Sequence, residues 1–120
     1  MGAHVLVVDD EPDLREALQD LLELDGYDVR CAEGGAEALE QVQTARPQLI
    51  ILDLMMPQMN GEEFLAELER RDLRRGILIL ILTADGSARA KAARLGADMG
   101  IAKPFDSAVF LEEIARLISR

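Results

Sequence analysis

Five polar side chains lie where apolar runs of strand length end, and their types suit phosphoryl-transfer chemistry. Asp9 and Asp10 follow the first run, Asp53 the third, Thr83 the fourth and Lys103 the fifth. In an open parallel sheet, ligands bind beyond the carboxyl ends of the strands. We therefore expect three carboxylates, one hydroxyl and one ammonium group, from four separate strand ends, to converge on a single site.

Three carboxylates at close range repel one another, which raises their pKa values unless a cation compensates. Carboxylate oxygens are hard ligands, and Mg²⁺ in proteins is commonly held by one or two carboxylates together with water and a phosphate oxygen. The cluster therefore predicts a site for Mg²⁺ (or Mn²⁺). A carboxylate such as Asp53 can then attack phosphorus and form an aspartyl phosphate. The lysine ammonium and the threonine hydroxyl would share the charge on the phosphoryl oxygens.

These acids also have a purely structural interpretation, which we consider weaker. Asp9 and Asp10 could cap the helix that follows them, but Pro12 and Asp13 already suit its first turn, so metal binding is favoured. Asp53 ends an apolar strand without opening a helix, which leaves it no capping role. The hydroxyl and the ammonium gain a functional interpretation only because they accompany the carboxylates.

The elements that must position these residues alternate regularly along the chain. Strands are expected over residues 4–8, 27–32, 49–52, 77–82 and 99–102, and helices over 13–25, 35–45, 62–71, 87–95 and from Asp106 onward. Five strands that alternate with five helices predict a doubly wound α/β domain with a parallel sheet. We expect a single domain over residues 1–120, because no repeat or linker interrupts the pattern.

The composition excludes several classes of protein. The 120 residues carry 23 acidic and 13 basic side chains, for a formal net charge of −10, and the whole of this excess lies in residues 1–60. A nucleic-acid binder or a polybasic membrane protein needs charge of the opposite sign. The longest apolar stretch, 77–82, is too short to span a bilayer. The single cysteine, Cys31, fits a reducing compartment, and we expect a cytoplasmic protein.

Several motifs give the chain a specific resemblance. They are VLVVDDEP at 5–12, ILDLMMP at 51–57 followed by Gly61, LTA at 82–84, GAD at 96–98 and KPF at 103–105. In this order and at these spacings they resemble the receiver domain of bacterial two-component response regulators, which is CheY-like. The resemblance covers essentially the whole chain. It implies a five-stranded parallel sheet of flavodoxin-like order 2-1-3-4-5, flanked by five helices.

The resemblance also implies a role for each residue of the cluster. Asp53 matches the phosphoacceptor, which takes a phosphoryl group from a histidine. Asp10 matches a direct Mg²⁺ ligand and Asp9 an acid that assists through a coordinated water. Thr83 matches the switch hydroxyl that moves toward the phosphoryl group, and Lys103 the ammonium that contacts it.

Two further matches concern the backbone. Met55 would contribute its carbonyl oxygen to the metal, while we interpret its side chain, with those of Met56 and Met59, as loop packing. The peptide bond before Pro104 is usually cis in the family, and cis bonds occur almost only before proline.

One position departs from the family pattern. Many receivers have an aromatic residue three positions before the lysine, where this chain has Gly100. We hypothesise that the readout depends instead on Thr83 and on backbone movement of residues 84–87, beginning at Ala84. Asp85, two residues after Thr83, could orient or repel the water that hydrolyses the phosphoryl group.

The resemblance predicts a regulatory switch more than an enzyme, with autophosphorylation and autodephosphorylation as its only intrinsic activities. Its implied partners are a sensor histidine kinase or a histidine phosphotransfer domain, and a downstream output protein or domain. Helix 13–25 and the loop after Pro104 would face the kinase. We expect no direct contact with nucleic acid or membrane, and a phosphorylation-dependent homodimer is left open.

Three other functions compete with this interpretation. A phosphorylation-independent, receiver-like interaction module would keep the fold without the chemistry, but the intact acidic set counts against it. A haloacid-dehalogenase-like phosphatase needs a second aspartate two residues after the nucleophile, where this chain has Met55. A flavodoxin-like FMN binder needs a Ser/Thr/Gly-rich phosphate loop after the first strand, and the acidic triplet Asp9, Asp10 and Glu11 would repel the phosphate.

Overall fold

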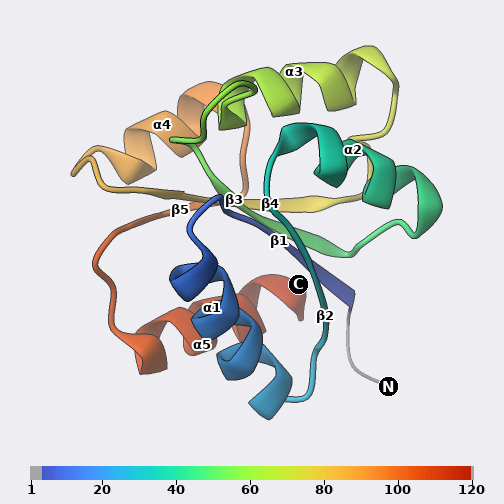
Figure 1. Cartoon of the computed structure of the whole chain (residues 1–120). Helices are drawn as coiled ribbons and strands as arrows, with labels where there is room; N and C mark the ends of the chain where they lie inside the picture. The colour runs from blue at the N-terminus through green and yellow to red at the C-terminus, as the bar shows by residue number, and fades with distance from the viewer. Residues whose placement is uncertain (1–3, 120) are drawn as a thin grey trace.

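The computed structural model describes residues 4–119 as one alternating series of strands and helices (Figure 1). The strands are β1 (His4–Val8), β2 (Asp28–Ala32), β3 (Leu49–Asp53), β4 (Leu78–Thr83) and β5 (Met99–Ala102). The helices are α1 (Pro12–Leu24), α2 (Gly35–Thr44), α3 (Gly61–Arg70), α4 (Ala88–Leu95) and α5 (Ser107–Ile118). Every predicted element is present, with ends within a few residues of those expected.

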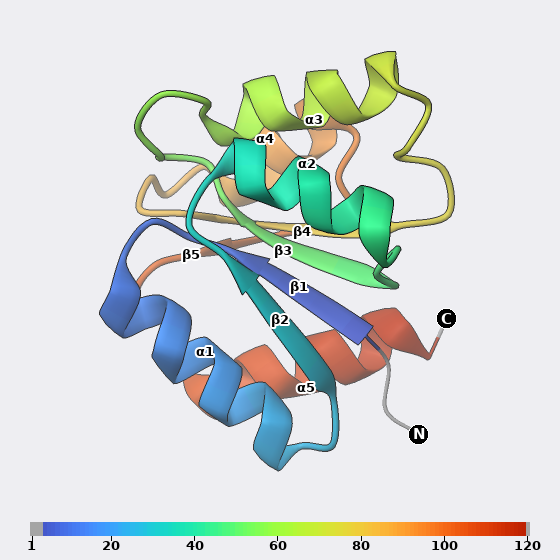
Figure 2. The same ribbon diagram turned by 45° about the vertical axis from the view of Figure 1, so that its right-hand side comes forward.

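The five strands form one parallel sheet in the order β2-β1-β3-β4-β5, which confirms the predicted topology. Helices α1 and α5 cover one face of the sheet, and α2, α3 and α4 cover the other (Figures 1 and 2). Since all strands run in the same direction, their carboxyl ends lie at one edge of the sheet. The order also reverses between β1 and β3, which is where such sheets bind ligands.

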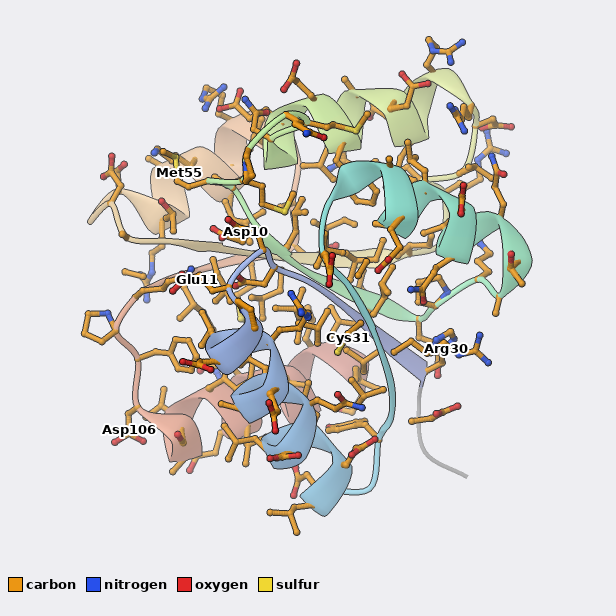
Figure 3. All side chains as sticks on the ribbon, viewed as in Figure 1. Asp10, Glu11, Arg30, Cys31, Met55 and Asp106 are labelled. Carbon is orange, nitrogen blue, oxygen red and sulfur yellow. The ribbon has the colours of Figure 1, made fainter. Side chains whose placement is uncertain are left out.

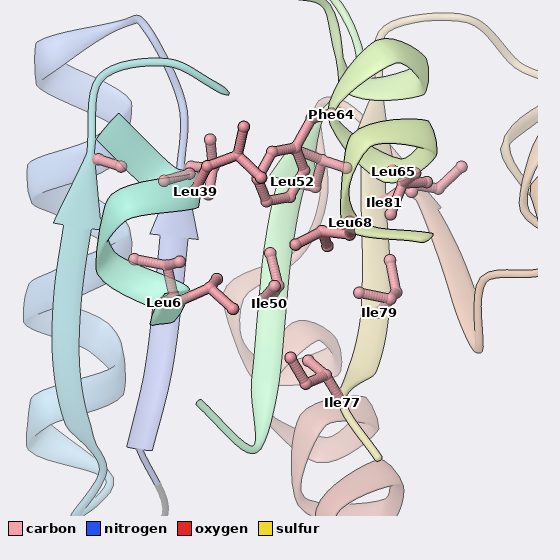
Figure 4. Close-up of a cluster of buried hydrophobic side chains, with 14 of the residues drawn as sticks. Leu6, Leu39, Ile50, Leu52, Phe64, Leu65, Leu68, Ile77, Ile79 and Ile81 are labelled. Atoms are coloured by element: carbon pink, nitrogen blue, oxygen red, sulfur yellow. The ribbon is translucent and has the colours of Figure 1, made fainter. Parts of the chain in front are cut away.

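The core consists of two layers that share the central strands. All five residues of β3 are buried, which explains why this strand shows no alternation of apolar and polar residues. On the α2–α3–α4 side, Ile50 and Leu52 pack among the side chains of Leu6, Phe64 and others (Figure 4). Their neighbours in sequence face the α1–α5 side. The site is therefore built at the ends of strands that are buried on both faces.

Two strands extend one residue further than the sequence predicted. Asp53 and Thr83 are the last residues of β3 and β4 and do not merely follow them. The reason is that their backbones stay in the ladder: Asp53 is in register with Leu82, and Thr83 with Ala102. Both functional candidates are thus held by strand pairing.

The helix ends carry signals that a sequence can encode. Asn60 caps α3 through a complete capping box, in which its side chain accepts from the Glu63 backbone and the Glu63 carboxylate accepts from the Asn60 backbone. Asp106 caps α5, as predicted, by accepting from two backbone N–H groups of the first turn. Gly96 ends α4 at φ 70°, a left-handed conformation that glycine adopts most easily.

Arg74 ties the loop before β4 to the end of α4. Its guanidinium donates to the carbonyl oxygens of Leu95 and Gly96, both at 2.8 Å, and pairs with Glu69 at 3.2 Å. The carbonyls at a helix C-terminus otherwise lack partners inside the helix.

Among the described residues, no helix has the length and apolarity needed to cross a membrane.

Candidate functional site

The carboxyl ends of β1 and β3 bring three acids together. Asp9, Asp10 and Asp53 each offer a carboxylate oxygen, and these oxygens lie within 4.8 Å of one another. Figure 3 shows the Asp10 side chain at this edge of the sheet, near Glu11 and below Met55. The convergence expected from the strand ends is therefore present for the carboxylates.

Asp53 is the most strongly constrained of the three. It is 2% exposed, its Oδ1 accepts a hydrogen bond from the Met55 backbone N–H at 3.1 Å, and its Oδ2 lies 3.5 Å from Lys103 Nζ. Burial raises the pKa of this carboxyl from 3.8 to about 6, and the Met55 hydrogen bond and the Lys103 charge only partly offset that effect. The neighbouring charge of Asp9 raises the pKa further.

Asp9 has an unusual buried oxygen. Its Oδ1 accepts from the Glu11 N–H at 2.9 Å, but its Oδ2 has no hydrogen-bond partner and lies 3.7 Å from Lys103 Nζ. Burial is the main cause that raises the pKa of Asp9 as well. A buried carboxylate oxygen without a partner is costly. This oxygen and its two acidic neighbours are hard ligands that fit a divalent cation.

Lys103 is the cation that the site itself supplies. Its Nζ lies 3.5 to 3.7 Å from carboxylate oxygens of Asp9, Glu11 and Asp53, so one ammonium faces several negative charges. Its backbone N–H donates to the Thr83 carbonyl at 2.8 Å, which fixes the end of β5 against β4. The Lys103–Pro104 peptide bond is cis, as the sequence led us to expect.

Glu11 belongs to this cluster and was not identified from the sequence. Its carboxylate lies 3.6 Å from Lys103 Nζ although its side chain is 64% exposed. The sequence predicts Glu11 only as part of the acidic triplet that would repel a phosphate, and gives it no place in the site. Only the position of Lys103, which directly follows β5 and is far away in the sequence, reveals the contact.

Thr83 occupies the end of β4, next to the strand that carries Asp53. It is 1% exposed, and its Oγ1 accepts a hydrogen bond from the Asp85 backbone N–H at 3.2 Å. The loop that begins at Ala84 is exposed and leads into α4. The structure therefore places the Thr83 hydroxyl, buried, at the base of an exposed loop.

The Met55 side chain differs from expectation, and Gly100 makes a close contact with the backbone of α4. The prediction that the Met55 side chain packs in the loop is wrong, because it is 70% exposed, whereas Met56 is buried as predicted. The reason is that the Met55 backbone turns toward Asp53 and leaves its side chain outside. At Gly100, a Cβ would lie 2.3 Å from the Ala88 carbonyl oxygen, so the first turn of α4 rests on β5 there.

Comparisons with known proteins agree with this geometry. A family model described as "Response regulator receiver domain" matches residues 5–115. Response regulator MprA of Mycobacterium ulcerans is 38% identical over 122 residues, which cover 100% of this chain and 52% of that protein. This chain therefore spans about half the length of the curated relatives it matches.

Solved structures give the same result. Chemotaxis response regulator CheY4 of Vibrio cholerae has a TM-score of 0.89 at 34% identity, with 98% of this chain and 99% of that chain covered. Response regulator TrrA of Thermotoga maritima, solved in complex with Mg²⁺-BeF, has a TM-score of 0.84 at 34% identity, with 98% and 99% covered. At 34% identity these proteins are similar to this chain in sequence as well as in fold.

Proposed function

The chain belongs to the family of response regulator receiver domains, and from that premise we propose that Asp53 is its phosphoacceptor. The phosphoryl group would come from a phosphohistidine of a sensor histidine kinase or a histidine phosphotransfer domain. The observation that carries the proposal is the buried Asp53 carboxylate, held 3.5 Å from Lys103 Nζ and grouped with two further acids.

In this reaction a carboxylate oxygen of Asp53 attacks phosphorus as the P–N bond to the histidine breaks. The electron pair of that bond stays on the imidazole nitrogen of the partner, and the product on this chain is an acyl phosphate. Hydrolysis then transfers the phosphoryl group to water and restores the carboxylate. The intrinsic autophosphorylation from small donors and the autodephosphorylation belong to the same proposal.

We propose Mg²⁺ (or Mn²⁺) as the cofactor, held by Asp10, Asp53 and the Met55 carbonyl, with Asp9 assisting through a bound water. The ion would neutralise charge on the phosphoryl oxygens and on the carboxylates. The residues of the chain do the rest: the backbone N–H of Met55 holds Asp53 in orientation through Oδ1, and Lys103 supplies positive charge where the phosphoryl oxygens would lie.

The switch itself is assigned to Thr83. Its hydroxyl would donate to a phosphoryl oxygen, and residues 84–87 would follow it. A downstream protein or domain would then recognise the altered surface. Whether a homodimer forms on phosphorylation stays open.

The surface around α1 is the proposed contact for the phosphodonor. A groove of about 650 Å³ runs between α1 and the loop after β5, and its lining includes Leu14, Leu21, Pro104 and Phe105. Lys103, which lies within 3.7 Å of Asp9 and Asp53 carboxylate oxygens, also lines this groove, so a partner seated there would lie beside the acidic cluster. We further propose that residues 1–120 form one receiver domain and that it acts in the cytoplasm, in keeping with its single cysteine.

The test is incubation with Mg²⁺ and phosphoramidate, followed by intact-mass measurement. We expect a gain of one phosphoryl group that base removes, and its loss in the variant Asp53→Asn. The control is Asp20→Asn, which makes the same chemical change at an exposed position of α1. No gain in the native protein, or a gain that persists in Asp53→Asn, would refute the assignment. The first result would favour the phosphorylation-independent interaction module.

A further inference from the structure

Asp85 connects the end of β4 to α4 through both its backbone and its side chain. Its N–H donates to Thr83 Oγ1 at 3.2 Å. Its Oδ1 accepts from the backbone N–H of Ser87 at 2.9 Å and from the Ser87 hydroxyl at 2.7 Å. Its Oδ2 lies 3.2 Å from Lys91 Nζ. One residue therefore links the switch hydroxyl to α4, and we call Asp85, Ser87 and Lys91 the Asp85 clasp.

The clasp fixes the residue at which α4 begins. Ser87 is the N-cap residue of α4, and its own side chain makes no capping hydrogen bond; the Asp85 carboxylate accepts the backbone N–H of Ser87 itself and so holds the N-cap residue in place. A negative charge at a helix N-terminus is favourable, and so is its pairing with Lys91 within the helix. The bonds from Ser87 and Lys91 lower the pKa of Asp85 to about 2, so the carboxylate stays charged.

The same contacts argue against a role for Asp85 in orienting the hydrolytic water. Both of its carboxylate oxygens face α4, one toward Ser87 and the other toward Lys91. A group that positions water needs an oxygen directed at the phosphoryl site. The side chain of Asp85 is therefore assigned to the helix.

The contact between α4 and β5 indicates which part of the molecule the Asp85 clasp could move, namely the first turn of α4. The first turn of α4 rests on Gly100, where the Ala88 carbonyl oxygen occupies the space that a side chain would need. Ala88 and Ala92 are buried against this surface. Small residues on both sides let the backbones approach closely, and no side chain at position 100 is present to take up a displacement of Thr83.

We propose that the Asp85 clasp couples the Thr83 hydroxyl to the first turn of α4, so that movement of Thr83 shifts the helix itself across Gly100. Asp85 and Lys91 act as positioning residues, since neither touches the acidic cluster. The inference rests on the proposed phosphorylation of Asp53 and adds the path by which it reaches the surface.

The experiment uses the variant Lys91→Gln with Arg94→Gln as its matched control. Both changes remove one positive charge from α4, and each breaks one ion pair; Arg94 pairs with Glu62 on α3 and has no contact with the clasp. Hydrogen exchange of the α4 amides is measured with and without Mg²⁺ and phosphoramidate. Intact mass records the phosphoryl occupancy of each sample.

In the native protein and in Arg94→Gln, we expect phosphorylation to change the exchange rates of the α4 first turn. In Lys91→Gln we expect the same phosphoryl occupancy, but a change in the exchange rates that is smaller by about threefold or more, because the ion pair between Asp85 and α4 is lost. Amide exchange is a suitable measurement because it reports local opening of the helix. A second variant, Gly100→Ala, should displace the first turn and speed its exchange before any phosphorylation. Exchange in β3 should stay slow in all variants, which confirms that they fold.

Three results would overturn the inference: α4 exchange that ignores phosphorylation in the native protein, an equal response in Lys91→Gln, or native exchange in Gly100→Ala. Failure of the proposed function looks different, because the native protein would then gain no phosphoryl mass.

Discussion

Replacing Asp53 by asparagine should stabilise the domain at neutral pH in the absence of divalent cations. The pKa of Asp53 rises from 3.8 to about 6 on folding, mainly because of burial. Between these two values the folded state holds more protons than the unfolded state, so stability falls as pH rises. Above pH 6 the charged carboxylate costs about 3 kcal/mol relative to a neutral group of the same shape, since one pKa unit corresponds to about 1.4 kcal/mol.

The assay is urea unfolding of the native protein and Asp53→Asn from pH 5 to pH 8, with a chelator present. We expect the variant to be more stable by about 3 kcal/mol at pH 8 and by about half of that at pH 5. The raised pKa of Asp9 acts in the same direction but is present in both proteins. Asp20→Asn, at an exposed position, should show no such pH-dependent difference.

Mg²⁺ provides the complementary measurement. A cation that binds only the folded state stabilises it, by about 1.4 kcal/mol at tenfold excess over its dissociation constant. The gap between the native protein and Asp53→Asn should therefore shrink when Mg²⁺ is added. A variant that is less stable than the native protein at pH 8 would refute the reasoning, because the bonds from Met55 and Lys103 would then outweigh burial of the charge.

Three further substitutions test how the elements around the site are held. Arg74→Ala should lower the free energy of unfolding by about 2 kcal/mol, because two helix-terminal carbonyls lose a charged donor, while Arg75→Ala, on a fully exposed ion pair, should change it little; urea unfolding measures both. Gly61→Ala should lower the free energy of unfolding by about 1–3 kcal/mol, because a Cβ there would lie 2.8 Å from the Leu54 Cα. The loop after Asp53 must then move, so phosphorylation should be slower; normal phosphorylation kinetics would contradict this. Asn60→Ala should cost about 1 kcal/mol in thermal unfolding through loss of the capping box, and Asn60→Asp should restore most of it.

The elements of this fold are predictable because their signals are local. The apolar residues of β3 have no polar neighbours to alternate with, which is typical of a central parallel strand, and all of them are buried. The ends of α4 and α5 follow from Gly96 and Asp106, whose backbone preferences depend on few distant contacts. The acids at the ends of β1 and β3 converge for the same reason, since a parallel sheet places all strand ends at one edge.

Contacts between elements are a different matter. Glu11 approaches Lys103, and Arg74 approaches Leu95 and Gly96, across 21 or more positions of sequence. Long side chains of this kind can reach many partners, and only the packed domain selects one. Charge and spacing therefore identified the acidic cluster but missed the residues that surround and support it.

Gly100 shows how a departure from a family pattern acquires a physical meaning only in three dimensions. In the sequence, Gly100 is a missing aromatic side chain, and the simplest interpretation is that the function of that side chain is lost. In the structure the vacated space is taken by the Ala88 carbonyl, so α4 lies against β5 through backbone. There is no space at that contact for a side chain that rotates, but the helix itself can move there. Asp85 holds the start of α4 to Thr83. Gly100 and the Asp85 clasp therefore act together in our proposal: α4 makes the movement that an aromatic side chain makes in receivers that have one at this position.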